Sequence, residues 1–219
     1  MERYFDGELD EIKMKLLLMG GSVESQLQDV LQALTERNVD LAIRVVKNDL
    51  MINMLHLEID EACRGLLALQ HPRAGDLRFI TTAMKISTGL KRMSDLAENV
   101  AERVTELNEV PQLKPYLDIP RMAGCTIRMV KESLDAFVNC DAELARKVCR
   151  DGGFIGGLAH QLFRKLVSFM MEDSRAITRA TRLTFIGKYY ERIADHATNI
   201  AELVVYMVEG KIIRHVTVS

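Results

Sequence analysis

One pattern of carboxylate and amide side chains occurs twice in the chain, at positions 100 residues apart. The segment RMSDLAENVAERV at residues 92–104 aligns with RIADHATNIAELV at residues 192–204, and seven of the thirteen pairs are identical. The identical pairs include an Asp, an Asn and a Glu, spaced by four and then three residues. Composition alone would not supply this agreement, so the pattern indicates an internal duplication.

These side chains would share one face of an α-helix. At about 100° of rotation per residue, the apolar residues of each segment fall opposite Asp95 or Asp195, which therefore face away from a bundle core. Carboxylates one helical turn apart can bring their oxygens together around a hard cation such as Mg²⁺, Mn²⁺ or iron. The duplicated face therefore predicts metal binding, with these candidate ligands: Asp95, Asn99 and Glu102 in the first copy, and Asp195, Asn199 and Glu202 in the second.

Other interpretations of the same face stay open. Charged residues four positions apart are usual on helix surfaces, so the face could simply be solvated. His196, next to Asp195, could ligate a metal or only donate a hydrogen bond. A di-iron carboxylate enzyme fits less well, because such bundles use inward-facing Glu residues with a His three positions later, and no His in this chain has that spacing.

The elements that carry this face are predicted to be helices. The chain is rich in Leu, Met, Ala, Glu, Lys and Arg, and apolar residues recur at intervals of three and four, as in Leu27, Val30 and Leu31. All four prolines lie at Pro72 or within residues 111–120, where they predict breaks between helices. We expect six helices, over about residues 6–36, 40–70, 75–108, 120–138, 142–172 and 175–209.

Helix ends and two glycine clusters refine this prediction. Asp40 and Asp141 are placed to cap the second and fifth helices, and Gly210 is placed to end the last one. Gly20 and Gly21 fall inside the first helix, and a GGFIGG stretch at residues 152–157 falls near the start of the fifth. The second cluster predicts either a local break or the close approach of another backbone.

The fold prediction is all-α, because no stretch shows the alternation of a strand framed by turn residues. Since the third and sixth helices correspond, each closes a three-helix unit. We therefore predict two tandem three-helix bundles related by internal duplication, over residues 1–110 and 118–210, which share a core along their length.

Composition and the lack of certain motifs exclude several classes of protein. With 219 residues, a formal charge of −2 and 5% aromatic residues, the chain does not favour nucleic-acid binding. It has neither an apolar run long enough to span a bilayer nor a signal-peptide pattern, so we expect a cytoplasmic protein. Its four cysteines lack CxxC spacing and are expected to be reduced and mostly packed, although a catalytic Cys stays open. The common nucleotide-binding and hydrolase motifs are absent from the sequence.

The chain resembles the PhoU family of phosphate-uptake regulators over essentially its whole length. The resemblance is strongest in LLALQHPRAGDLRFI at residues 66–80, in the paired segments KRMSDLAENVAE and ERIADHATNIAE, and in the opening segment at residues 5–27. It implies two three-helix bundles and a cytoplasmic, non-enzymatic protein that negatively regulates phosphate uptake and the phosphate-starvation response. Such a protein would couple the ATPase subunit of a phosphate ABC transporter to a sensor histidine kinase, reaching the membrane only through these partners. A homodimer is also expected.

The resemblance also implies metal. The paired segments are similar to E(D)xxxD motifs that hold multinuclear iron clusters or other metals, so iron, Mn, Mg, Ni or Zn is expected. Glu191 and Asp195 match the second motif in full, whereas in the first copy Lys91 stands where an acid is expected and only Asp95 remains. Because a Lys ammonium repels a metal cation and removes one ligand, this departure argues against a first-copy site. A metal-free helical scaffold is the remaining alternative.

Overall fold

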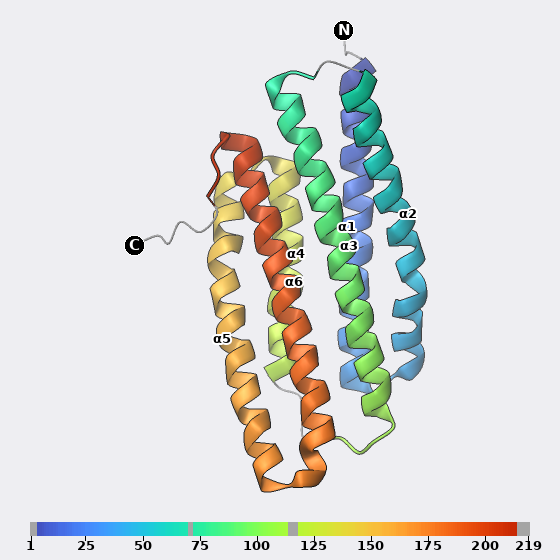
Figure 1. Ribbon diagram of the computed structural model, residues 1–219, viewed down its shortest axis with the longest axis vertical. Helices are drawn as coiled ribbons and strands as arrows, with labels where there is room; N and C mark the ends of the chain where they lie inside the picture. Colours follow the sequence, from blue (N-terminus) through green and yellow to red (C-terminus); the bar gives the residue numbers. More distant parts are fainter. Residues whose placement is uncertain (1–3, 70–71, 114–117, 214–219) are drawn as a thin grey trace.

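The computed structural model describes residues 4–69, 72–113 and 118–213, and within these ranges the chain is all-α (Figure 1). It forms α1 (Tyr4–Glu36), α2 (Val39–Leu69), α3 (Ala74–Asn108), α4 (Asp118–Asn139), α5 (Ala142–Glu172) and α6 (Ile177–Glu209), with a 3-10 turn at Ser174–Ala176 before α6. The six predicted helices are confirmed, and their described ends lie within two residues of the prediction. Residue 70, the predicted end of the second helix, and Pro115 lie outside the described ranges.

Two of the three predicted helix-end residues are confirmed and one is wrong. Asp141 accepts hydrogen bonds from the backbone N–H groups of Glu143 and Leu144 in the first turn of α5, and Gly210 ends α6 in the left-handed conformation, with φ of 70°. Asp40, however, lies inside the first turn of α2. The cap is Asn38, whose side-chain oxygen accepts the N–H of Leu41 at 3.0 Å, because α2 begins one residue earlier than predicted and Asn caps as well as Asp.

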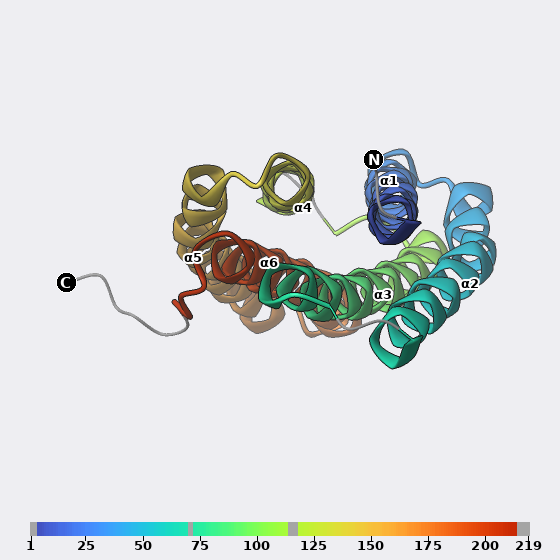
Figure 2. The same cartoon turned by 90° about the horizontal axis from the view of Figure 1, so that it is seen from above.

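The helices form two three-helix bundles, α1–α3 and α4–α6, packed side by side. Seen from above, α2, α3, α6 and α5 follow one another in a row, and α1 and α4 lie on one side of that row (Figure 2). The duplicated helices α3 and α6 are neighbours at the centre of the row and run antiparallel (Figure 1). The prediction of two tandem bundles related by duplication is confirmed.

The seam between the bundles is part of one continuous core rather than a surface contact. Buried apolar residues of all six helices belong to a single cluster. Across the seam the rings of Phe79 and Phe137 stack with centroids 5.8 Å apart, and Arg182 pairs with Glu106 at 2.8 Å. A Cβ added at Gly89 on α3 would lie at ordinary van der Waals distance from the side chain of Ile200 on α6, so the two helices pack closely at this point.

The glycine clusters interrupt neither α1 nor α5, which both continue through them. At Gly152 the neighbour is the side chain of Thr198 on α6, not a backbone, and a Cβ at this position would lie 2.7 Å from the Thr198 hydroxyl. Gly20 similarly leaves space for the side chain of Leu134 on α4. These glycines let helices approach closely, which offsets their low helix propensity.

None of the described helices contains a stretch that is long and apolar enough to cross a lipid bilayer.

Candidate functional site

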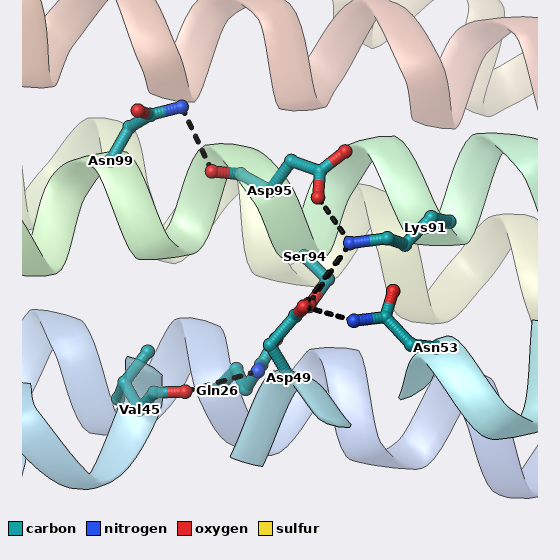
Figure 3. A network of polar contacts seen from close by, with 8 residues as sticks. All are labelled: Gln26, Val45, Asp49, Asn53, Lys91, Ser94, Asp95 and Asn99. Carbon is teal, nitrogen blue, oxygen red and sulfur yellow. Dashed lines mark hydrogen bonds and ion pairs between the residues drawn. The ribbon is translucent and has the colours of Figure 1, made fainter. Parts of the chain in front are cut away.

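The first copy of the duplicated pattern lies on α3 and is joined to α2 by a lysine (Figure 3). The Lys91 ammonium lies 3.2 Å from each carboxylate oxygen of Asp49 on α2. It also donates a hydrogen bond to Asp95, one turn further along α3. One ammonium therefore pairs with two carboxylates that come from different helices.

Asp49 connects this pair to the core. Asp49 is only 7% exposed. The hydroxyl of Ser94 lies 2.7 Å from the Asp49 carboxylate and 2.7 Å from the amide oxygen of Gln26. Gln26, on α1, donates to the backbone oxygen of Val45 on α2. The network thus runs from the solvent edge of α3 to α1 (Figure 3).

The prediction missed Asp49, although its position carries a signal. Val45 and Ile52, one turn to either side, are fully buried, so the helical period places Asp49 close to the apolar face of α2. A carboxylate there needs hydrogen-bond donors and a cation nearby. Only the packing of α2 on α3 reveals that Lys91 supplies the charge.

The electrostatics of this cluster keep the lysine charged. Burial disfavours the Lys91 ammonium, but its hydrogen bonds to Asp95 and Asp49 outweigh that effect and raise its pKa above the ordinary value. The pKa of Glu98, one turn beyond Asp95, is raised by burial and by the charge of Asp49, an effect that Lys91 partly offsets. The site is therefore rich in carboxylates and holds one built-in cation.

The spacing of the three carboxylates suits a metal ion, but the lysine beside them does not. Oxygens of Asp49, Asp95 and Glu98 all lie within 4.8 Å of one another, a spacing that a hard cation could bridge. The Lys91 ammonium, however, already donates to two of these three carboxylates. The first copy therefore does not fit a metal ion as long as Lys91 is present.

The other predicted ligands of the first copy do not converge on Asp95. The Asn99 amide donates to the backbone oxygen of Asp95 at 2.9 Å, so it is used within α3. Glu102 is exposed and pairs with its neighbour Arg103 at 3.2 Å. Neither side chain belongs to the three-carboxylate group.

The second copy, on α6, has a different environment. Asp195 and Asn199 are exposed, as predicted for an outward face. Glu191 is partly buried, lines a groove between α5 and α6, and pairs with Lys188 at 2.6 Å. Burial, and to a smaller extent the negative charge of Glu191 one turn earlier on α6, raise the pKa of Asp195.

Three further residues near Glu191 and Asp195 are weaker candidates for metal ligands. The pKa of His196 is lowered by burial and by Arg192, against the effect of Asp195, which favours a neutral imidazole beside the acidic pair. Helical periodicity puts Thr198 on the same side of α6 as Asp195, but its hydroxyl is buried because α5 covers it at Gly152. Glu202 lies seven residues beyond Asp195, about 10 Å along the helix axis.

Within the described part of the chain, no third His, Cys, Asp or Glu joins Glu191 and Asp195 in a group compact enough for one ion. Two carboxylates are fewer donors than a multinuclear cluster takes. They fit a single ion that keeps most of its water, as Mg²⁺ and similar divalent ions do.

Two of the four cysteines have thiols that are hard to ionise. Burial raises the pKa of Cys63 to about 11, and burial together with Glu202 raises that of Cys149 to about 11. Both thiols are therefore protonated at neutral pH and poorly nucleophilic. Cys140 is exposed, so it is an exception to the prediction that the thiols are mostly packed.

Known proteins share both the sequence and the fold. The chain matches the PhoU domain family over residues 16–104 and again over residues 119–204. It is 42% identical to the phosphate-specific transport system accessory protein PhoU homolog of Aquifex aeolicus, covering 95% of this chain and 94% of that protein. It is 34% identical to the phosphate-specific transport system accessory protein PhoU of Escherichia coli, with coverage of 97% and 88%. The crystal structure of PhoU from Pseudomonas aeruginosa superposes with a TM-score of 0.92 at 39% identity, covering 94% of this chain and 100% of that one.

Proposed function

The chain belongs to the PhoU family, and from this premise we propose that it is a non-enzymatic accessory protein that negatively regulates phosphate uptake and the phosphate-starvation response. The observation that carries the proposal is the match of both repeats, in order and over nearly the full length, to proteins named as accessory to phosphate transport. In this role it acts on the cytoplasmic side of the membrane, between the ATPase subunit of a phosphate ABC transporter and a sensor histidine kinase.

An apolar ridge on α2 supports a protein-binding role. Leu50, Met54 and Leu57 are spaced by four and three residues, lie on one face of α2, and are 71%, 63% and 64% exposed. Leu18 of α1 adds a further exposed apolar side chain. Contiguous exposed apolar side chains on a folded protein often mark contacts with other proteins.

Regulation is tested by deleting the gene in the source organism and following a phosphate-starvation reporter in phosphate-rich medium. We expect the reporter to rise several-fold after deletion and to fall again when the wild-type chain is restored, because repression requires the chain. Repression that persists after deletion would contradict the regulatory role.

The deletion strain also shows whether the α2 ridge is needed for repression. A chain with Leu50→Asp, Met54→Asp and Leu57→Asp should fail to restore repression and should no longer retain the transporter or the kinase in a pull-down. Met171→Asp is the control, because Met171 is an apolar residue outside the ridge that is even more exposed, at 83%. The expected homodimer is tested on the same proteins by light scattering.

We also propose that Glu191 and Asp195 hold a metal ion on the outward face of α6, with iron or Mn, and also Mg, Ni or Zn, as candidates. The family motif and the mutual repulsion of these two carboxylates support this proposal. Asn199 lies one turn beyond Asp195 on the same exposed face, so it is the next donor along α6.

Metal content of untagged protein, purified without chelator and measured by mass spectrometry, tests this site. We expect the wild type to carry metal and the Glu191→Ala/Asp195→Ala variant to lose it, because the variant removes both charged donors. Asp95→Ala/Glu102→Ala, at duplicated positions on α3, should keep the metal. Undiminished metal in the first variant would contradict the assignment, and metal-free wild type would favour a metal-free scaffold.

A further inference from the structure

We propose that the Lys91 side chain is the resident cation of the first repeat, and that its ammonium takes the place that a divalent cation would otherwise occupy among Asp49, Asp95 and Glu98. The fold thus neutralises a partly buried acidic cluster with a side chain of its own, a property that is separate from the regulatory function.

The geometry of the cluster carries the inference. The three carboxylates approach one another within 4.8 Å, and Asp49 is nearly buried. Like charges at this distance in a partly buried setting repel each other, so the cluster needs a positive charge. Lys91 supplies it, at 3.2 Å from both oxygens of Asp49 and in direct contact with Asp95.

The duplication provides an internal comparison. Lys91 aligns with Glu191, and Glu98 aligns with Thr198. The first repeat thus has a cationic side chain and a third acid where the second repeat has a carboxylate and a neutral hydroxyl. In the second repeat the positive charges that act on the acids come from side chains at the surface of α6: Lys188, which is largely exposed and pairs with Glu191, and Arg192, which is also exposed and acts on Asp195.

A tethered ammonium has a property that a bound ion lacks. It cannot be removed by a chelator and does not exchange with the cell's metal pool. The contact between α2 and α3 should therefore be insensitive to metal, and any metal dependence of the protein should arise from α6.

Chemical rescue tests the inference. The background is the Glu191→Ala/Asp195→Ala variant, in which α6 offers no acidic pair, and Lys91→Gln is introduced into it. Thermal unfolding is followed in EDTA and in millimolar MnCl₂. We expect the background to have the same Tm in both buffers. With Lys91→Gln, we expect a Tm about 5 °C lower in EDTA, because the carboxylates lose their counter-charge, and recovery of most of that loss in MnCl₂.

Two matched variants make the result specific. Lys91→Arg keeps a cation in place and should show no response to Mn²⁺. Adding Glu98→Gln to Lys91→Gln removes one of the three carboxylates and should abolish the recovery. Calorimetric titration with MnCl₂ gives a second readout, in which Lys91→Gln should gain one binding site relative to the background.

The inference is overturned if Lys91→Gln gains no Mn²⁺ site, or if the background with Lys91 intact responds to Mn²⁺ as strongly as the variant does. If Lys91→Gln does not fold in EDTA, folding that returns in MnCl₂ supports the inference. Failure to fold in both buffers would show that the aliphatic stem of Lys91, not its charge, is required, and would reject it.

Discussion

Replacing Asp49 by Ala should destabilise the protein by about 3 kcal/mol, because removing one partner of a largely buried ion pair leaves the other groups without compensation. Asp49 accepts from Lys91, Ser94 and Asn53. Lys91 would keep Asp95 as a partner, which places the expected loss at the lower end of the range for buried pairs. For a chain of 219 residues this corresponds to a fall in Tm of roughly 6–12 °C.

Denaturant unfolding followed by circular dichroism measures this change, and Asp60→Ala on the same helix is the control. Asp60 pairs with Arg64 at 3.0 Å, but Arg64 is well exposed. Exposed pairs of this kind contribute roughly 0.5 kcal/mol or less. A loss at Asp49 no larger than the loss at Asp60 would show that the polar network has no net stabilising effect.

The sequence predicts the fold well because helix periodicity is a local signal. Apolar spacing and prolines set the six helices, and the 100-residue repeat identifies α3 and α6 as equivalent. The cap at Asp141 follows from the same local logic. The error at Asp40 is also local, since Asn38 is an equally good cap two residues earlier.

The site is less predictable because it depends on contacts between distant residues. Nothing within α2 shows that Asp49 meets Lys91, which lies 42 residues away. Helical geometry assigns Thr198 to the outward face, but it cannot show that α5 covers this residue at a glycine. The sequence did show that Lys91 breaks the motif, and the packing shows which acids its charge meets.

The two repeats should not fold as independent domains. One cluster of buried apolar residues runs through both halves of the chain. A fragment of residues 1–110 would expose part of this cluster together with Phe79, which stacks on Phe137 of α4, and would lose the pairing of Glu106 with Arg182. We expect such a fragment to retain helix but to self-associate, without the cooperative stability of about 5–15 kcal/mol typical of folded domains.

Light scattering and thermal unfolding of the fragments 1–110 and 111–219, alone and mixed, measure this dependence. Mixing should restore a cooperative unfolding transition, because the two fragments can associate and bury the apolar residues that each exposes when it is alone. Glu106→Ala in the first fragment is a mild control that should weaken the association without abolishing it, since apolar burial contributes most of the seam. If each fragment unfolded cooperatively as a monomer, the shared core would not be needed for folding. The repeats would then be two domains in contact, and the antiparallel pairing of α3 and α6 would be an interface that could open.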